Sequence, residues 1–364
     1  MKNSKLIVVL GMHRSGTSAV ARGLEVLGVR LGDNLYPAAI DNPKGFWEDN
    51  DFLAINEELL EYLGSSVDRL GLIDWQMPST SRIKSLELKA EKLVSEKCKK
   101  NALWGFKDPR TARLLPFWQP VFVRVGCDVR YVIATRNPMS IVESLYKRSG
   151  FEAGITFYLW LEHLIPAISG TMNAKRVVVD YDQLLENPEL QLLRVAKALG
   201  ATAPEPVALV AFESEFLEVG LRHTHFTMHD LERYPAVPPQ VVTAYDWLVR
   251  LANDSVLLDG AEIKRAFEAL SQELVVLSPA LSFIGYQEQK IVAIAGREQL
   301  IAALQAQVQD QLKGAAWLTS QRDAWEQSAV HSQQSVATLE AKLHKIRSHW
   351  GMRLVNLLCK NKIL

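Results

Sequence analysis

The chain has 364 residues, of which 48% are hydrophobic and 23% are charged. These proportions are typical of a globular protein, and the length fits one large domain with an appendage or two ordinary domains. The 41 basic and 41 acidic residues cancel, so the net charge does not favour a nucleic-acid partner.

The cysteines and the N-terminus together predict a cellular location. Cys98, Cys127 and Cys359 are too far apart for a CxxC metal motif and too few for a disulfide framework, which favours a reducing compartment. The apolar run from Lys5 to Leu10 is shorter than the roughly 7–15 apolar residues of a secretory signal. Because no stretch reaches the ~18 uncharged apolar residues of a membrane span, we expect a cytoplasmic protein.

The pattern of apolar residues predicts strands that alternate with helices. Lys5 to Leu10 is short, β-branched and ended by Gly11, as expected of a buried strand. A helix closed by Gly28 follows the loop. Further buried strands are expected at 104–106, 129–135 and 176–180, with helices at 141–148 and 188–199 among the segments between them. This order predicts an α/β fold with a parallel sheet and helices on both faces.

The C-terminal third has a different composition. Residues 235–280 are helical in pattern, and beyond Gly285 the chain is rich in Gln, Ala and Glu with apolar residues at three-or-four spacing. Residues 287–364 carry ten Lys/Arg and six Asp/Glu, a net charge of +4 against −4 for the rest. Such a basic amphipathic helix either lies on an anionic membrane surface or pairs with a partner helix, for example in a homo-oligomer.

The segment GMHRSGTS, residues 11–18, joins the first strand to the first helix. A glycine loop at a helix N-terminus points backbone N–H groups at one place and forms an anion site. Nucleotide kinases carry a lysine where Thr17 stands here, so Arg14 is the expected cation of this loop. An ordinary tight turn would explain the glycines but not Arg14, Ser15, Thr17 and Ser18 together.

A second group of polar residues follows the strand at 129–135. Arg136 stands at its carboxyl end, where open α/β sheets bind ligands, and Asn137 and Pro138 suit the start of a helix. Ser140 and Ser144 then lie on one face of that helix. The alternative is a surface arginine with two serines near a helix start.

These two segments together resemble the sulfotransferases that use 3′-phosphoadenosine 5′-phosphosulfate as donor. Residues 42–48 (NPKGFWE), 106–110 (FKDPR) and 178–188 resemble further elements of bacterial members, so the likeness spans roughly residues 5–200. It implies a P-loop-like core in which the first loop holds the phosphosulfate and Arg136 and Ser144 hold the 3′-phosphate. The loop residues so implied are Gly11, His13, Arg14, Ser15, Gly16, Thr17 and Ser18.

The resemblance also assigns chemical roles. Arg14 would neutralise the bridging oxygen as the nucleotide departs, and no metal is required. Glu48 corresponds to the general base of related enzymes, although a capping or salt-bridging role is the alternative. Asp49, Asp108 and His13 are the other candidate bases. Donor or acceptor positioning is expected of Lys44, Lys107, Arg110, Arg222 and His223. His223, His225 and His229 lack the neighbouring cysteines or acids of a zinc site.

The sequence therefore predicts a sulfotransferase that acts on a hydroxyl of a glycan or a small molecule. A cell-surface polysaccharide is the first choice, because residues 349–353 resemble C-terminal helices of bacterial surface-polysaccharide enzymes. We expect a catalytic domain over 1–235, a helical extension over 236–285 and a basic tail over 286–364. The protein is expected in the cytoplasm, where the tail could attach it to the inner membrane face. The alternatives are a P-loop kinase with an aberrant loop and a non-catalytic helical adaptor.

Overall fold

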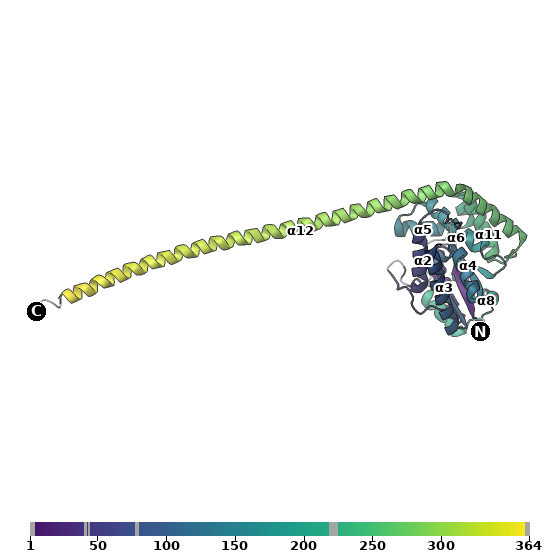
Figure 1. The fold of residues 1–364 in the computed structure, drawn as a ribbon, viewed down its shortest axis with the longest axis horizontal. Helices are drawn as coiled ribbons and strands as arrows, with labels where there is room; N and C mark the ends of the chain where they lie inside the picture. The colour runs from purple at the N-terminus through teal and green to yellow at the C-terminus, as the bar shows by residue number, and fades with distance from the viewer. Residues whose placement is uncertain (1–3, 40–41, 43, 77–79, 218–224, 361–364) are drawn as a thin grey trace. The chain divides into compact units, whose positions relative to one another are not determined.

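The computed structural model describes residues 4–39, 42, 44–76, 80–217 and 225–360, with side chains of the last helix described to Arg353 and at Asn356. The chain divides into two units, Met1–Gln289 and Lys290–Leu364. The first unit contains the sheet and most of the helices (Figure 1). The second consists of the greater part of one long helix.

A five-stranded sheet forms the centre of the first unit. Its order is β2-β3-β1-β4-β5, and every pair is parallel. The predicted α/β fold with a parallel sheet is therefore confirmed, and the sequence analysis missed only the two-residue strand β2. The strands are β1 (Lys5–Leu10), β2 (Arg30–Leu31), β3 (Leu103–Lys107), β4 (Asp128–Thr135) and β5 (Lys175–Asp180).

The side chains of β1 show why the sheet is covered on both faces. Leu6, Val8 and Leu10 enter one hydrophobic core, and Ile7 and Val9 enter the other. Successive residues of a strand point to opposite faces, so a continuous apolar run requires cover on both.

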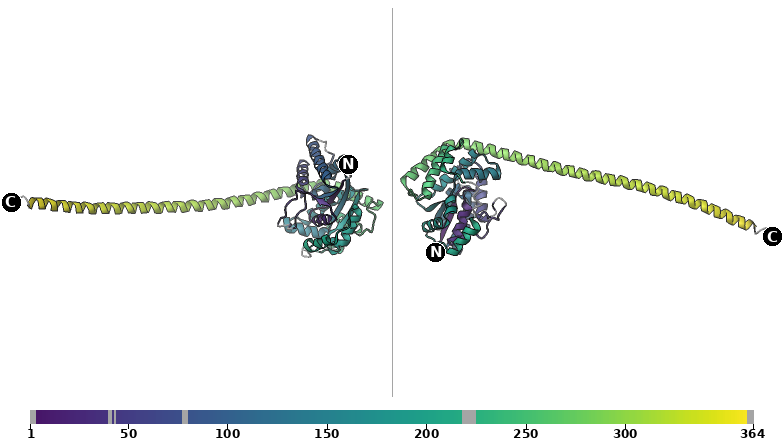
Figure 2. Two further views of the ribbon diagram at one scale, coloured as in Figure 1. Left: turned by 90° about the horizontal axis from the view of Figure 1, so that it is seen from below. Right: turned by 180° about the vertical axis from the view of Figure 1, so that it is seen from behind.

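Helices form the two covering layers (Figures 1 and 2). The core of Leu6 includes residues of α2 (Asn50–Tyr62), α3 (Ser81–Lys100), η1 (Pro109–Ala112), α4 (Leu115–Val125), α5 (Pro138–Ser149), α6 (Ala153–Ser169), α10 (Met228–Arg233) and α11 (Pro239–Ala252). The core of Ile7 includes residues of α1 (Thr17–Val26), α7 (Tyr181–Glu186), α8 (Pro188–Leu199), α9 (Pro206–Ala211) and the π-helical turn η2 (Phe212–Phe216).

The long helix α12 (Ala261–Lys360) starts inside the first unit. Ile263, Phe267 and Leu270 are buried in the core of Leu6, so the start of this helix shares the core of the sheet. By length and composition alone, Ala261–Arg353 is the one helix in the described part of the chain that is apolar enough to cross a membrane. The apolar stretch that meets this test is 22% buried, and length and composition alone are weak evidence of a membrane span.

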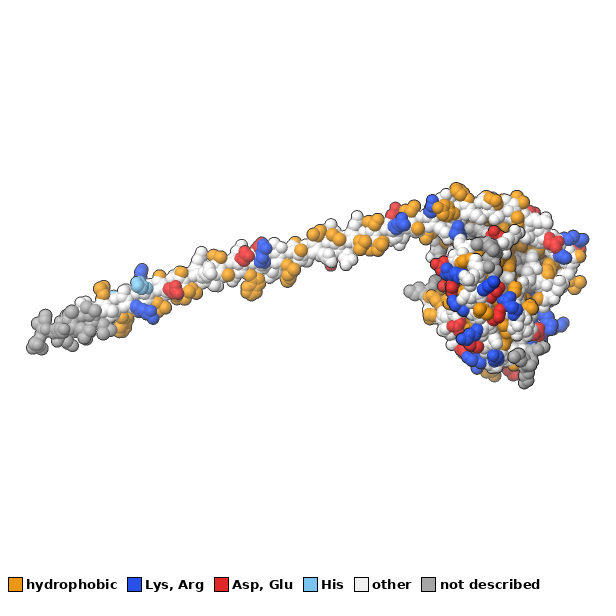
Figure 3. All heavy atoms as spheres, viewed as in Figure 1, with side chains coloured by type: hydrophobic (Ala, Val, Ile, Leu, Met, Phe, Trp, Pro, Cys, Tyr) orange, Lys and Arg blue, Asp and Glu red, His pale blue; other side chains and the backbone are white. Residues whose placement is uncertain are grey.

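The second unit is helical from Lys290 to Lys360, which confirms the predicted long C-terminal helix. Its apolar side chains, among them Ile294, Ile301 and Leu304, are exposed. They lie among polar side chains along this helix (Figure 3). Pairing of this helix into a coiled coil stays a prediction.

Candidate anion and transfer site

The loop between β1 and α1 has a backbone that requires its glycines. Gly11 has φ of +142° and Gly16 has φ of +86°, a region that side chains rarely adopt. A Cβ at Gly11 would lie 2.6 Å from the carbonyl oxygen of Ala134, and a Cβ at Gly16 would lie 2.4 Å from the ring of Tyr181. The loop is thus held between β4 and the start of α7, at the carboxyl end of the parallel strands.

Several polar side chains of this loop support its own structure. Ser15 is buried, and its hydroxyl donates to the carbonyl of Met12 at 2.6 Å. Ser18 donates to the carbonyl of Phe46 at 3.2 Å. Ser15 was expected to contact the donor, but its hydroxyl is used to fix the turn, so only its backbone remains suited to that contact. Thr17 begins α1 and is also buried.

The second predicted segment meets the first directly. The Nε of Arg14 donates to Oγ of Ser144 at 2.8 Å, although the two residues are 130 positions apart. Asn137 caps α5 by accepting from the N–H of Met139, and Pro138 occupies the first turn, as predicted. The glycine loop and α5 are therefore joined by a hydrogen bond between side chains.

Buried hydroxyl groups accompany Arg136. The guanidinium of Arg136 lies 4.7 Å from the centre of the Tyr181 ring, in cation–π geometry. The hydroxyl oxygens of Thr135 and Ser140 are buried and have no hydrogen-bond partner within the described residues. Since buried polar groups are almost always paired, these hydroxyls indicate a ligand or water position. The sequence analysis had not assigned Thr135 or Tyr181 to the site.

A network of charges lies beside the loop. Lys107 donates from Nζ to Glu48 Oε1 at 2.6 Å and also to the carbonyl of Phe46 at 3.0 Å. Arg110 donates to Glu48 Oε2 at 3.3 Å and to Asp108 Oδ1 at 3.0 Å. Glu48 thus has the salt bridges that were the alternative to its role as base, and that role stays a prediction.

Two of the other candidate bases have structural partners. Asp108 is fully buried, caps η1 through the N–H of Arg110 and accepts from Nδ2 of Asn56 at 3.0 Å. Asp49 caps α2 and pairs with Lys97 at 2.9 Å. Both oxygens of Asp108 are bound inside the protein, one of them by Arg110, and its catalytic role stays a prediction.

The remaining predicted residues lie elsewhere or outside the described part. Lys44 donates from Nζ to the carbonyl of Glu215 at 2.6 Å, so this contact directs it toward η2. Arg222 and His223 fall outside the described residues. Within the ranges that the structure describes, no group of three His, Cys, Asp or Glu residues could hold a metal ion.

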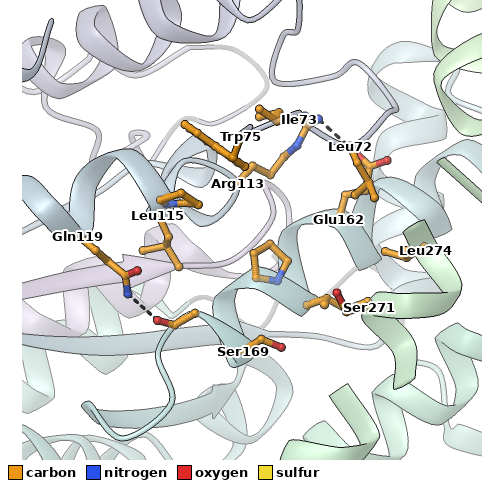
Figure 4. A pocket seen from close by; sticks show the side chains of 14 residues that line it. Leu72, Ile73, Trp75, Arg113, Leu115, Gln119, Glu162, Ser169, Ser271 and Leu274 are labelled. Atoms are coloured by element: carbon orange, nitrogen blue, oxygen red, sulfur yellow. Dashed lines mark hydrogen bonds and ion pairs between the residues drawn. The ribbon is translucent and has the colours of Figure 1, made fainter. Parts of the chain in front are cut away.

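A cavity of about 420 Å³ lies between α4, α6, α12 and the segment after α2 (Figure 4). Its lining is mostly apolar, and Arg113 and Glu162 form a buried ion pair of 3.2 Å in its wall. The N–H of Gly71 donates to the other oxygen of Glu162 at 2.8 Å. Burial raises the pKa of Glu162 to about 7, against a smaller lowering by Arg113.

This shift predicts how stability depends on pH. The pKa of Glu162 is near 7 in the folded protein, and its ordinary value is 4.5. The contribution of Glu162 to the unfolding free energy is therefore fully present below pH 4.5 and is lost as the pH rises to about 7. The expected loss is about 3 kcal/mol of unfolding free energy. Glu162→Gln should remove this slope in urea titrations at several pH values, whereas Glu152→Gln, an exposed change at the start of the same helix, should keep it. Parallel curves for wild type and Glu162→Gln would contradict the assignment.

The solved structures that are similar to this chain include two sulfotransferase domains. No family model matches the chain, and no curated protein matches it. The sulfotransferase domain from the Synechococcus PCC 7002 olefin synthase is 15% identical with a TM-score of 0.36, covering 76% of this chain and 96% of that one. The sulfotransferase domain from the curacin biosynthetic pathway is 14% identical with a TM-score of 0.37, covering 74% and 99%. Both belong to the family that the motifs resemble, but scores this low carry no weight for activity, which rests on the site residues.

Proposed function

We propose that this protein transfers the sulfuryl group of 3′-phosphoadenosine 5′-phosphosulfate to a hydroxyl group. The observation that carries the proposal is the contact between Arg14 and Ser144, which joins the glycine loop to the middle of α5. A donor with a phosphosulfate at one end and a 3′-phosphate at the other needs two anion sites on one surface. The buried, unpaired hydroxyls of Thr135 and Ser140 beside Arg136 fit the second site.

The residues of the chain would act mainly by alignment and charge stabilisation. Backbone N–H groups at the start of α1 favour an anion at the loop, because the helix dipole has its positive end there. Arg14 supplies the cation at the bridging oxygen, where negative charge develops as the nucleotide leaves. Sulfuryl transfer leaves little for covalent catalysis, so correct placement of the two reactants supplies much of the rate.

The surroundings of the loop support a polar acceptor. Glu48, Lys107 and Arg110 form a charged group next to it, and such groups hydrogen-bond to the hydroxyls of a sugar. We therefore propose a glycan as acceptor in preference to an apolar alcohol.

The two rival functions are less well supported. A kinase would need a lysine at Thr17 and one continuous phosphate track with a magnesium-binding acid. An adaptor would not need the buried hydroxyls of Thr135 and Ser140 next to Arg136.

Calorimetry with adenosine 3′,5′-bisphosphate and with ATP tests the proposal. We expect magnesium-independent binding of the bisphosphate that Arg136→Ala weakens at least 100-fold, because a buried phosphate loses its charged partner. Arg136→Lys should recover only part of the loss. Lys147→Ala is the matched control. Lys147 is an exposed residue of α5, the helix that follows Arg136, and it pairs with Glu143. Preference for ATP with magnesium would refute the proposal.

A further inference from the structure

We propose that His13, held by Asp68, takes the proton from the acceptor hydroxyl. This inference rests on the proposed sulfuryl transfer. It assigns the base to a residue of the glycine loop itself, next to Arg14. It also assigns a positioning role to Asp68, which no motif in the sequence marks.

The first support is the contact between the two residues. Nε2 of His13 lies 3.4 Å from Oδ1 of Asp68, which belongs to the segment between α2 and α3. Arg113 fixes this segment by donating to the carbonyls of Ser66 at 3.0 Å and Gly71 at 2.8 Å, on either side of Asp68. The carboxylate is therefore held at a defined place beside the loop.

The second support is a set of unpaired polar atoms. Both ring nitrogens of His13, Oδ1 of Asp68 and Nε2 of His163 are buried and make no hydrogen bond within the described residues. The rings of His13 and His163 lie 6.2 Å apart, edge to face. Buried polar atoms without partners are rare, and several in one place indicate a polar molecule that belongs there. With Nε2 toward Asp68, Nδ1 is the nitrogen that remains for the acceptor hydroxyl.

The charges around the pair favour the form of histidine that a base requires. Burial lowers the pKa of His13 well below its ordinary value, and His163, Arg148, Lys107 and Arg110 lower it further. His13 is therefore neutral before the reaction, and the carboxylate of Asp68, 3.4 Å from Nε2, is the group that would stabilise its protonated form. Burial raises the pKa of Asp68, while Arg148, Arg110 and Arg113 oppose this.

Glu48 has fewer means to accept this proton. Lys107 donates to one of its oxygens and Arg110 to the other. Both carboxylate oxygens are therefore engaged within the protein, which leaves less room for an acceptor hydroxyl at either one. The geometry thus favours a role in which Glu48 orients Lys107 and Arg110.

The proposed step balances in atoms and electrons. The acceptor hydroxyl gives its proton to Nδ1 of His13, and its oxygen forms the new bond to sulfur. The bond between sulfur and the bridging oxygen breaks, and adenosine 3′,5′-bisphosphate leaves with the electron pair. The imidazolium that results carries a positive charge beside the carboxylate of Asp68, which stabilises it.

Two acceptors that differ in acidity provide the test. D-glucose must lose a proton during transfer, whereas p-nitrophenol at pH 8.5 arrives largely ionised. His13→Ala should reduce transfer to glucose at least 100-fold, and Asp68→Asn should reduce it at least 10-fold. For each variant the loss should be several-fold smaller with p-nitrophenol. Asp74→Asn is the control, because Asp74 lies in the same segment and accepts from the N–H of Gln76.

Nitrogen NMR of histidine-labelled protein tests the pairing without turnover. We expect neutral His13 at pH 7 with its proton on Nε2, and a loss of this tautomer preference in Asp68→Asn. A proton on Nδ1, or equal losses with both acceptors, would overturn the inference. Transfer to glucose should fall at acidic pH, because protonated His13 cannot accept a proton. This fall should remain in Glu48→Gln. If Glu48→Gln no longer shows the fall, the base is Glu48. Failure of the wild type to bind the bisphosphate would instead refute the proposed function.

Discussion

Replacing Arg14 by alanine should reduce turnover by about 10³-fold while the fold stays intact. Arg14 stands in the glycine loop with φ of +68°, and its Nε is held by Ser144. The charge that develops on the leaving nucleotide then loses its guanidinium. The rate of bisphosphate release at saturating donor measures the effect.

Glycine at the same position separates charge from backbone strain. Arg14→Gly also lacks the guanidinium, but glycine adopts positive φ without cost, so this variant should be about 1 kcal/mol more stable than Arg14→Ala. Both variants should be equally slow. Arg14→Lys keeps the charge and should recover part of the rate. A change in donor affinity with unchanged turnover would place Arg14 in ground-state binding only.

Replacing Gly16 by alanine should lower the unfolding free energy by about 3 kcal/mol and weaken bisphosphate binding at least 100-fold. The added Cβ would lie 2.4–2.7 Å from atoms of Tyr181. The guanidinium of Arg136 lies over that ring, 4.7 Å from its centre. Any shift of Tyr181 that relieves the overlap would also displace Arg136 from the proposed phosphate site.

A second glycine provides the control for this prediction. Gly28 has a similar φ of +77°, but nothing lies within 4 Å of a Cβ built there. Gly28→Ala should therefore show the backbone cost alone, about 1 kcal/mol, with normal binding. Thermal denaturation and calorimetry of the two variants measure the difference. Equal effects of both substitutions on binding would show that Tyr181 does not connect the two anion sites.

The sequence identified the elements whose signals are local. The run of β1, the glycine loop and the cap at Asn137 depend on residues that are close in the chain, and all three were predicted. The sequence analysis placed Arg14 and Ser144 in two anion sites but did not predict the contact between them, which the structure shows.

Other features of the site depend on contacts that no local pattern reveals. Asp68 lies in a segment without motif character, and Arg113 binds backbone carbonyls on either side of it. Tyr181 begins α7 but its effect is on Gly16 and Arg136, which are distant in sequence. The paired state of Glu48 likewise required the positions of Lys107 and Arg110 in space.

The parallel order of the sheet also governs how the chain can fold. The central strand β1 has no partner close in sequence, because Lys5 pairs with Leu103 on one side and with Asp128 on the other. Closing loops of this length costs entropy before any pairing contributes, and such topologies fold slowly. During synthesis the apolar β1 segment therefore has no strand to pair with until β3 and β4 have left the ribosome. Chaperone demand and aggregation in this protein should thus be concentrated in that interval of translation.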